Sequence, residues 1–93
     1  MKSASARHIL VDDEATCQKL KADIEGGEDF AAVARTRSTC PSAATGGDLG
    51  TFRPGEMVAE FDKVVFSGEV GKVHGPVRTQ FGYHLIEITR RTD

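Results

Sequence analysis

The N-terminal stretch of the chain alternates its side chains with the period of a strand. Residues 6–11 are short, apolar and partly β-branched, which predicts a strand. Alternation places His8 and Leu10 on one face of that strand. Ile9 and Val11 fall on the opposite face. His8 is therefore expected on a strand rather than in a loop.

A second alternating pattern lies near the C-terminal end. Residues 83–91 predict a strand in which His84 and Ile86 share one face. Residues 76–79 predict another strand, and the intervening residues 80–82 are typical of a hairpin turn because they include a glycine. This part of the chain therefore predicts two antiparallel strands.

Three apolar stripes at helical spacing predict three helices. Their members are Cys17, Leu20 and Ile24 in the first, Phe30, Val33 and Ala34 in the second, and Val58, Phe61 and Val65 in the third. Asp12 or Asp13 is expected to cap the first helix and Asp29 the second, because a carboxylate can accept from the free amides of a helix N-terminus. Glycines at 26–27 and at 68 end the first and third helices.

The middle of the chain is less regular. Pro41 can start one short turn, and residues 49–53 are a candidate short strand. The predicted order is then strand, two helices, strand, helix and two strands, which is typical of an α+β fold with a small, mostly antiparallel sheet. With 93 residues and no linker long enough to separate domains, residues 1–93 are expected to form one domain.

Composition narrows the class of protein. The chain is 39% hydrophobic and 28% charged, as in ordinary globular domains, and its net charge is −2. That balance argues against nucleic acid or an anionic membrane as the main partner. Apolar runs stay far below the length of a membrane span. Residues 1–6 show no apolar leader, and two cysteines suggest free thiols in a reducing compartment, so a cytoplasmic location is expected.

His8 and His84 are the first candidates for chemistry. If the first and last predicted strands are neighbours, the two imidazoles can meet on one face of the sheet. Two adjacent imidazoles would share one hydrogen bond, and burial would keep both neutral at pH 7. The alternative is a pair of unrelated strand histidines, and their spacing alone leaves this open.

Cys40 could be a nucleophile, a metal ligand or a hydrogen-bond partner. Cysteine–histidine pairs can carry out acyl transfer, but the sequence shows no oxyanion arrangement and no third orienting residue. The three histidines and Cys40 are too scattered for a zinc site, so no metal is expected. Cys17 lies at a helical core position and is expected to be packed there.

A glycine-rich loop and several apolar residues near turns also call for interpretation. Residues 46–50 resemble a fragment of a phosphate loop, but they lack its Lys-Ser/Thr pair, which argues against nucleotide binding. The glycines more simply permit positive φ in a tight bend. Met57, Phe61 and Phe81 are either core residues or part of an apolar pocket. Phe81 is the better pocket candidate, because a phenylalanine in a hairpin turn has little else to cover.

Several short strings share their order and spacing with one known family. They are Arg7-His8-Ile9-Leu10-Val11, Cys40-Pro41-Ser42, Gly46-Gly47-Asp48-Leu49-Gly50-Thr51-Phe52, Gly55-Glu56-Met57-Val58, Gly75-Pro76-Val77 and Thr79-Gln80-Phe81-Gly82-Tyr83-His84-Leu85-Ile86. Each string alone is weakly specific. Together, over about residues 6–91, the chain resembles the parvulins, which are small peptidyl-prolyl cis/trans isomerases.

The resemblance implies a fold and a site. The fold would be the parvulin (FKBP-like) fold, a four-stranded antiparallel sheet surrounded by about four helices, the fourth being the turn after Pro41. The catalytic positions would be His8, Cys40, Thr79 and His84. The substrate-binding positions would be Leu49, Met57, Phe61, Gln80 and Phe81. Thr79 would hydrogen-bond the histidine pair.

The resemblance also implies an activity, the non-covalent rotation of Xaa-Pro bonds in proteins and peptides, assisting folding without a cofactor. The partners would be proline-containing polypeptides, and a monomer is the default. One branch of the family reads phosphorylated Ser/Thr-Pro with basic residues after the first strand. Here that junction is Asp12-Asp13-Glu14, whose charge would repel a phosphate, so no phosphate preference is expected.

Three other readings of the sequence stay open. A binding module could hold unfolded segments as a chaperone and isomerise them slowly. A structural or interaction domain would have no pocket function. A thiol hydrolase would use Cys40 as its nucleophile. The sequence does not name a physiological substrate.

Overall fold

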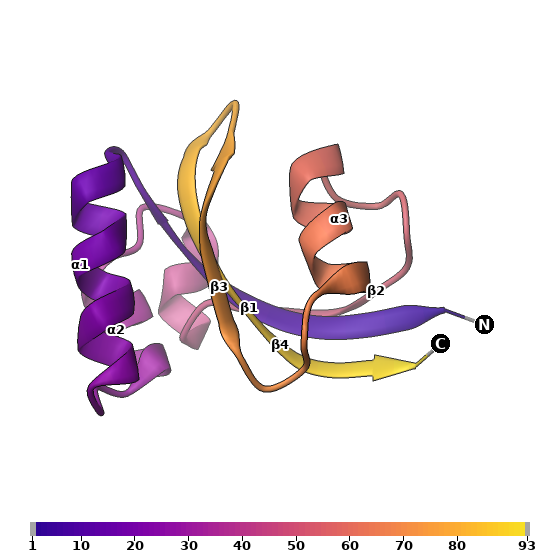
Figure 1. Ribbon diagram of the computed structural model, residues 1–93, viewed down its shortest axis with the longest axis horizontal. Coiled ribbons are helices and arrows are strands. Elements are labelled where there is room, and N and C mark those ends of the chain that lie inside the picture. The colour runs from indigo at the N-terminus through magenta and orange to yellow at the C-terminus, as the bar shows by residue number, and fades with distance from the viewer. Residues whose placement is uncertain (1, 93) are drawn as a thin grey trace.

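The computed structural model describes residues 2–92, and its centre is a four-stranded antiparallel sheet (Figure 1). The strand order across the sheet is β2-β1-β4-β3. In chain order the elements are β1 (Ser3–Val11), α1 (Glu14–Glu25), α2 (Phe30–Arg37), the 3₁₀ helix η1 (Pro41–Thr45), β2 (Asp48–Phe52), α3 (Ala59–Ser67), β3 (Val73–Thr79) and β4 (Gly82–Thr92). The predicted α+β class and antiparallel sheet are confirmed.

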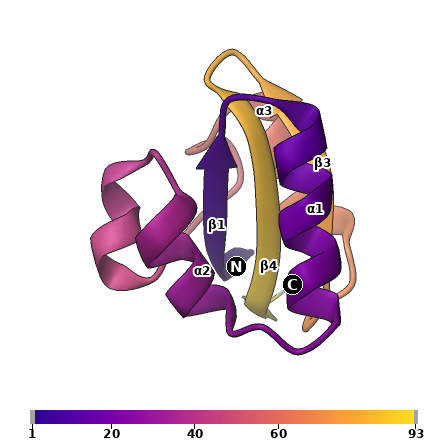
Figure 2. The same ribbon diagram turned by 90° about the vertical axis from the view of Figure 1, so that its left-hand side faces the viewer.

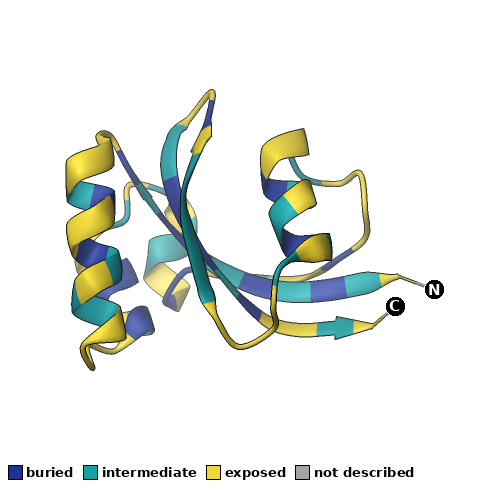
Figure 3. Ribbon diagram, in the orientation of Figure 1, coloured by how far each residue is buried: buried dark blue, intermediate teal, exposed yellow. Residues whose placement is uncertain are grey.

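The helices cover both faces of the sheet. α1 and α2 lie together on one face, and α3 lies on the other (Figures 1 and 2). One core lies under α1 and α2 and contains Ile9, Val11, Cys17, Leu20, Phe30, Val33, Ala34 and Leu85. The other lies under α3 and contains Ala4, Ala6, Phe52, Phe61, Val65 and Ile86. Burial is accordingly greatest along the central strands and the inward helix faces (Figure 3).

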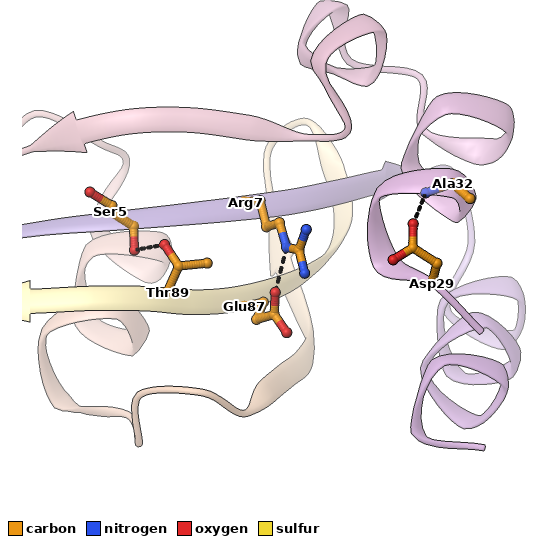
Figure 4. Close-up of polar contacts among 6 residues, drawn as sticks. All are labelled: Ser5, Arg7, Asp29, Ala32, Glu87 and Thr89. Atoms are coloured by element: carbon orange, nitrogen blue, oxygen red, sulfur yellow. Dashed lines mark hydrogen bonds and ion pairs between the residues drawn. The ribbon is translucent and has the colours of Figure 1, made fainter. Parts of the chain in front are cut away.

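The predicted caps form as expected. The Asp13 carboxylate accepts from the backbone N–H of Thr16 at 2.9 Å and begins α1. The Asp29 carboxylate accepts from the N–H of Ala32 at 3.0 Å and begins α2 (Figure 4). Both helices therefore begin where the sequence predicts.

The two central strands, β1 and β4, are tied by side chains as well as by their backbone. Arg7 forms a partly buried ion pair with Glu87 across the strands, and the Thr89 hydroxyl donates to the Ser5 carbonyl at 3.0 Å (Figure 4). The Arg7 guanidinium also lies 4.9 Å from the centre of the Phe30 ring, which joins β1 to α2. These contacts fix the strand pair that carries both candidate histidines.

Some boundaries differ from the predictions. β1 begins at Ser3 rather than residue 6, because Ala4, between two serines, is a small residue buried under α3 and gives little hydrophobic signal. β3 begins at Val73 rather than residue 76. The expected fourth helix is the 3₁₀ turn η1. Among residues 2–92, no helix is long and apolar enough to cross a membrane.

Candidate active site

His8 and His84 meet on the α3 face of the sheet. Their strands are neighbours, with Leu10 opposite His84 in the register, so the two histidines lie diagonally across the pair. Their Nδ1 atoms are 3.0 Å apart, and their rings stack at an interplanar angle of 17°. Both side chains are buried. The predicted pairing is therefore present, and the alternative of two unrelated histidines is wrong.

The imidazole pair is the middle of a longer hydrogen-bonded chain. At one end, His8 Nε2 lies 3.1 Å from the Ser42 hydroxyl. At the other end, His84 Nε2 lies 2.7 Å from the Thr79 hydroxyl, which also accepts from the N–H of Phe81 at 3.1 Å. All four ring nitrogens therefore have partners within the protein.

The environment keeps the two histidines uncharged. Burial, with a smaller contribution from the neighbouring His84, lowers the pKa of His8 to about 4. Burial also lowers the pKa of His84, while the Glu60 carboxylate acts in the opposite direction. Both imidazoles are neutral at pH 7, as the sequence predicts for a buried pair.

An apolar wall from α3 stands against the histidines. The Phe61 ring meets both imidazoles edge-on, with ring centres 5.6 Å from His8 and 5.8 Å from His84. Leu49 and Met57 are partly buried and pack against the same core. The structure thus brings three of the five predicted substrate-binding residues together. Phe61 itself is buried, whereas Leu49 and Met57 are partly exposed.

The remaining two predicted substrate-binding residues, Gln80 and Phe81, form the turn between β3 and β4. Gln80 is exposed, and Phe81 is 60% exposed. Most of the Phe81 residue is therefore accessible to solvent. Its backbone N–H is nevertheless part of the histidine network through Thr79. The turn is therefore linked to the site by its backbone, while both of its side chains are exposed.

Cys40 precedes η1 and has no hydrogen bond to its sulfur among the residues described. Its backbone N–H lies 3.4 Å from the Ser38 hydroxyl, which also accepts from the N–H of Leu10 at 3.0 Å. Since both nitrogens of each histidine have other partners, Cys40 is not paired with a base. Burial raises the pKa of the Cys17 thiol to about 11, and Glu14 adds to the effect, consistent with a packing role.

The glycine string predicted to bend sharply does so beside His8. Gly46 and Gly47 have φ of 71° and 85°. The His8 N–H donates to the Gly47 carbonyl at 2.9 Å. A Cβ atom on Gly47 would lie 2.3 Å from the His8 carbonyl oxygen. The glycine therefore allows the loop to approach the strand that carries the histidine.

Two serines of this site are absent from the predicted set. Ser42 contacts His8 from η1, and Ser38 joins the Cys40 loop to β1. Ser42 falls within the Cys40-Pro41-Ser42 string, so that string was the available signal. Nothing in the local sequence around Ser38 indicates its contact with Leu10. Among the described residues, no group of three potential metal ligands gathers.

Comparison with known proteins identifies the family. A family model described as rotamase, PPIC-type PPIase domain, matches residues 6–90. The foldase protein PrsA of Geobacillus kaustophilus is 49% identical over 85 residues, which cover 90% of this chain and 30% of that protein. The chain therefore spans about a third of the length of the curated relatives it matches.

Solved structures agree with this assignment. The crystal structure of the peptidylprolyl isomerase PrsA from Bacillus anthracis has a TM-score of 0.95 at 34% identity, covering 99% of this chain and 43% of that one. The solution structure of NmPin, the parvulin of Nitrosopumilus maritimus, has a TM-score of 0.85 at 32% identity and covers 95% of this chain and 96% of that one. The fold, the sequence match and the paired histidines agree: this chain belongs to the parvulin-type rotamases, the family of PPIC-type peptidyl-prolyl isomerase domains.

Proposed function

We propose that the protein containing this domain assists folding by rotating Xaa-Pro bonds in proline-containing polypeptides, and that the site described above performs the rotation. The observation that carries the proposal is the buried, neutral pair of His8 and His84 beneath the Phe61 ring. The relatives named foldase and peptidylprolyl isomerase support the same activity.

The reaction itself is a rotation about a C–N bond with partial double-bond character. Because the Xaa-Pro imide resists twisting, uncatalysed exchange takes tens of seconds or longer. A catalyst must favour the twisted state over both planar states. Water stabilises the charge separation of the planar imide, so an apolar surface that excludes water disfavours the planar state.

In this proposal the apolar wall holds the proline ring. Phe61, Met57 and Leu49 pack around one core on the α3 face, next to the imidazoles. They would grip the pyrrolidine ring while the residue before proline rotates past Cys40. The turn containing Gln80 and Phe81 would contact the bound chain at the rim. The shared place of Phe61, Met57 and Leu49 on the α3 face supports their part in this proposal.

The histidines act in this proposal without transferring a proton. Each ring nitrogen is already bonded to Ser42, Thr79 or the other imidazole, so no nitrogen is free to act as a general base. Their part is to fix the shape and polarity of the pocket floor. The same geometry argues against the thiol hydrolase, because Cys40 lacks a base that could activate it.

A change at Cys40 tests the non-covalent assignment. We expect Cys40→Ser and Cys40→Asp to keep measurable turnover, because no bond to sulfur forms during a rotation. Exchange rates of both variants, with circular dichroism as the check on folding, decide the point. Loss of turnover in both folded variants would establish that the thiol itself is needed.

The charge beside the turn supports a substrate preference. Val11 pairs with Tyr83, so the junction that follows β1 lies next to the β3–β4 turn. That junction carries Asp12, Asp13 and Glu14, all exposed. Arg78 is a basic residue near this turn. It pairs with Tyr83 in the sheet register, so its side chain lies on the face of the sheet opposite to that of His84. We propose that the enzyme does not prefer phosphorylated Ser/Thr-Pro, because carboxylates would repel the phosphate.

NMR exchange spectroscopy tests the activity and the preference together. It would compare peptides that differ only before proline, with Leu, Ser, phosphoserine or Glu, at catalytic amounts of protein. We expect accelerated cis/trans exchange for all unphosphorylated peptides and no gain from phosphate. Faster turnover of the phosphoserine peptide than of the leucine peptide would overturn the preference. Peptide shifts without faster exchange would favour the chaperone-type binding module instead.

Three further expectations are part of the proposal. Residues 1–93 would act as one isomerase domain, supported by a single sheet that joins all the strands described. A monomeric state is proposed as the default, which sedimentation analysis would test. A cytoplasmic location is proposed from the free thiols Cys17 and Cys40 and awaits localisation in cells.

A further inference from the structure

The helix that forms the pocket wall ends without a basic residue of its own. The last turn of α3 contains no lysine, arginine or histidine. The final carbonyls of any helix lack partners within the helix and carry partial negative charge. In α3, Gly68 N–H satisfies the Val64 carbonyl at 2.7 Å. The carbonyls of Val65 and Gly68 need donors from elsewhere.

Arg91 of β4 supplies these donors. Its Nη1 donates to the Val65 carbonyl at 3.1 Å and also to the Gly68 carbonyl. The side chain is partly buried at this position. A guanidinium at a helix C-terminus also interacts favourably with the helix dipole. One arginine thus joins the end of α3 to the last part of the central strand pair.

The contact between Arg91 and the end of α3 affects the site because α3 carries Phe61. Phe61 lies on the same helix face one turn before Val65, and it contacts both His8 and His84. The loop after α3 is largely exposed, but its Gly71 N–H donates to the Ile88 carbonyl of β4 at 2.7 Å, so this end of the helix is held to the sheet by a backbone bond as well as by Arg91. The C-terminal end is therefore a point where the distance between α3 and the sheet can be set.

We propose that Arg91 is a positioning residue that sets the placement of the α3 wall, and with it Phe61, over the histidine pair. The inference rests on the proposed isomerase function of this site. Arg91 lies beyond residues 6–90, the part matched by the family model. Its two bonds to carbonyls at the end of α3 connect it to the helix that carries Phe61.

The test compares Arg91→Ala with Arg90→Ala, a matched control on the same strand. Arg90 is exposed, and none of the hydrogen bonds or ion pairs found among residues 2–92 involves its side chain. Exchange rates at increasing concentrations of a Leu-Pro peptide give KM and kcat for each protein. The NMR chemical shifts of Phe61 and His84 show whether α3 has moved relative to the histidine pair. We expect Arg91→Ala to raise KM about three- to tenfold with a smaller change in kcat, because a displaced wall weakens ring binding in ground and transition states alike.

A second variant keeps the test decisive if Arg91→Ala does not fold. Arg91→Lys keeps the charge and a donor, so it should shift KM less and move the Phe61 resonances less. Unchanged KM and resonances in both Arg91 variants, as in Arg90→Ala, would overturn the proposal. A fall in kcat with KM unchanged would also overturn it. Absence of turnover in the wild-type protein would refute the isomerase function. The chemical shifts of Phe61 and His84 in the Arg91 variants would still show whether Arg91 sets the placement of α3.

Discussion

At the scale of single residues, the direction of the hydrogen bonds through the histidine pair follows from one backbone group. The Phe81 N–H can only donate, so it occupies one of the two acceptor sites on the Thr79 hydroxyl. Among residues 2–92, His84 Nε2 is then the one acceptor found for the Thr79 hydrogen, and donation to it satisfies that buried hydroxyl. In that arrangement His84 donates from Nδ1 to His8 Nδ1, and His8 donates from Nε2 to Ser42. The network would thus have one preferred order.

The first prediction concerns this order. We expect ¹⁵N spectra at pH 7 to show neutral rings, with His84 protonated on Nδ1 and His8 on Nε2. Thr79→Val should leave His84 Nε2 buried without a donor and cost about 1–3 kcal/mol of unfolding free energy. Thr79→Ser keeps the hydroxyl and is the control. The opposite tautomers in the wild-type spectrum would show that Ser42, not Thr79, donates into the chain.

The second prediction concerns Met57. Met57→Ala should raise KM for a Leu-Pro peptide several-fold, because it removes part of the apolar wall. Its cost in stability should stay within about 1–2 kcal/mol, since the side chain is only partly buried. Val70→Ala, which shortens an exposed apolar residue 42% accessible to solvent, serves as the control. Equal KM values for the two variants would remove Met57 from the substrate-binding set.

At the scale of elements, the loop from η1 to β2 places the first histidine. Gly46 follows η1 in the left-handed conformation, and Gly47 then passes against the backbone of β1. The Gly47 N–H donates to the Ser42 carbonyl at 2.8 Å, so the same turn also orients the serine that meets His8. Two backbone bonds at one glycine therefore connect η1, β1 and the site.

The third prediction compares two glycines with similar backbone angles. Gly47 and Gly50 have φ of 85° and 72°, but only Gly47 would place a Cβ against β1. Gly50→Ala should cost about 1–2 kcal/mol from the left-handed conformation alone. Gly47→Ala should cost about 3–5 kcal/mol because overpacking is added. Thermal unfolding should show a drop of about 4–8 °C for each kcal/mol. Similar midpoints for both variants would contradict the close approach at Gly47.

At the scale of the whole molecule, the uncharged histidines link stability to pH. The pKa of His8 falls from 6.5 in the unfolded chain to about 4 in the folded one, so the unfolded state binds more protons between these values. Stability from this group is complete above pH 6.5 and is lost progressively as the pH falls towards 4. His84 acts in the same direction. Protonation in this range therefore favours unfolding.

The fourth prediction follows from that sign. Between pH 7.5 and 5.0, His8 should remove about 2 kcal/mol of unfolding free energy. Urea denaturation at the two pH values measures the loss. His8→Gln, which does not titrate, should show a loss smaller by that amount. The same loss in both proteins would mean that carboxylates, not His8, cause the acid sensitivity.

Much of the fold could be predicted from the sequence because it depends on local geometry. The period of the apolar residues fixes the face on which His8, His84 and Phe61 lie, and Asp13 and Asp29 mark two helix starts. Small residues such as Ala4 give no such signal, so the start of β1 was placed too late. Strand and helix identity therefore came from the chain, and some boundaries did not.

The site divides in the same way. Sequence patterns singled out the two histidines, Cys40 and the apolar residues near turns, whereas only the family resemblance added Leu49, Thr79 and Gln80. Only the tertiary structure decided that Ser42 meets His8, that Ser38 joins β1 to the Cys40 loop, and that Arg91 closes the end of α3. These contacts join segments 23 to 34 positions apart. Periodicity tells which face a residue occupies, whereas sheet register and helix packing determine which distant residue lies opposite it.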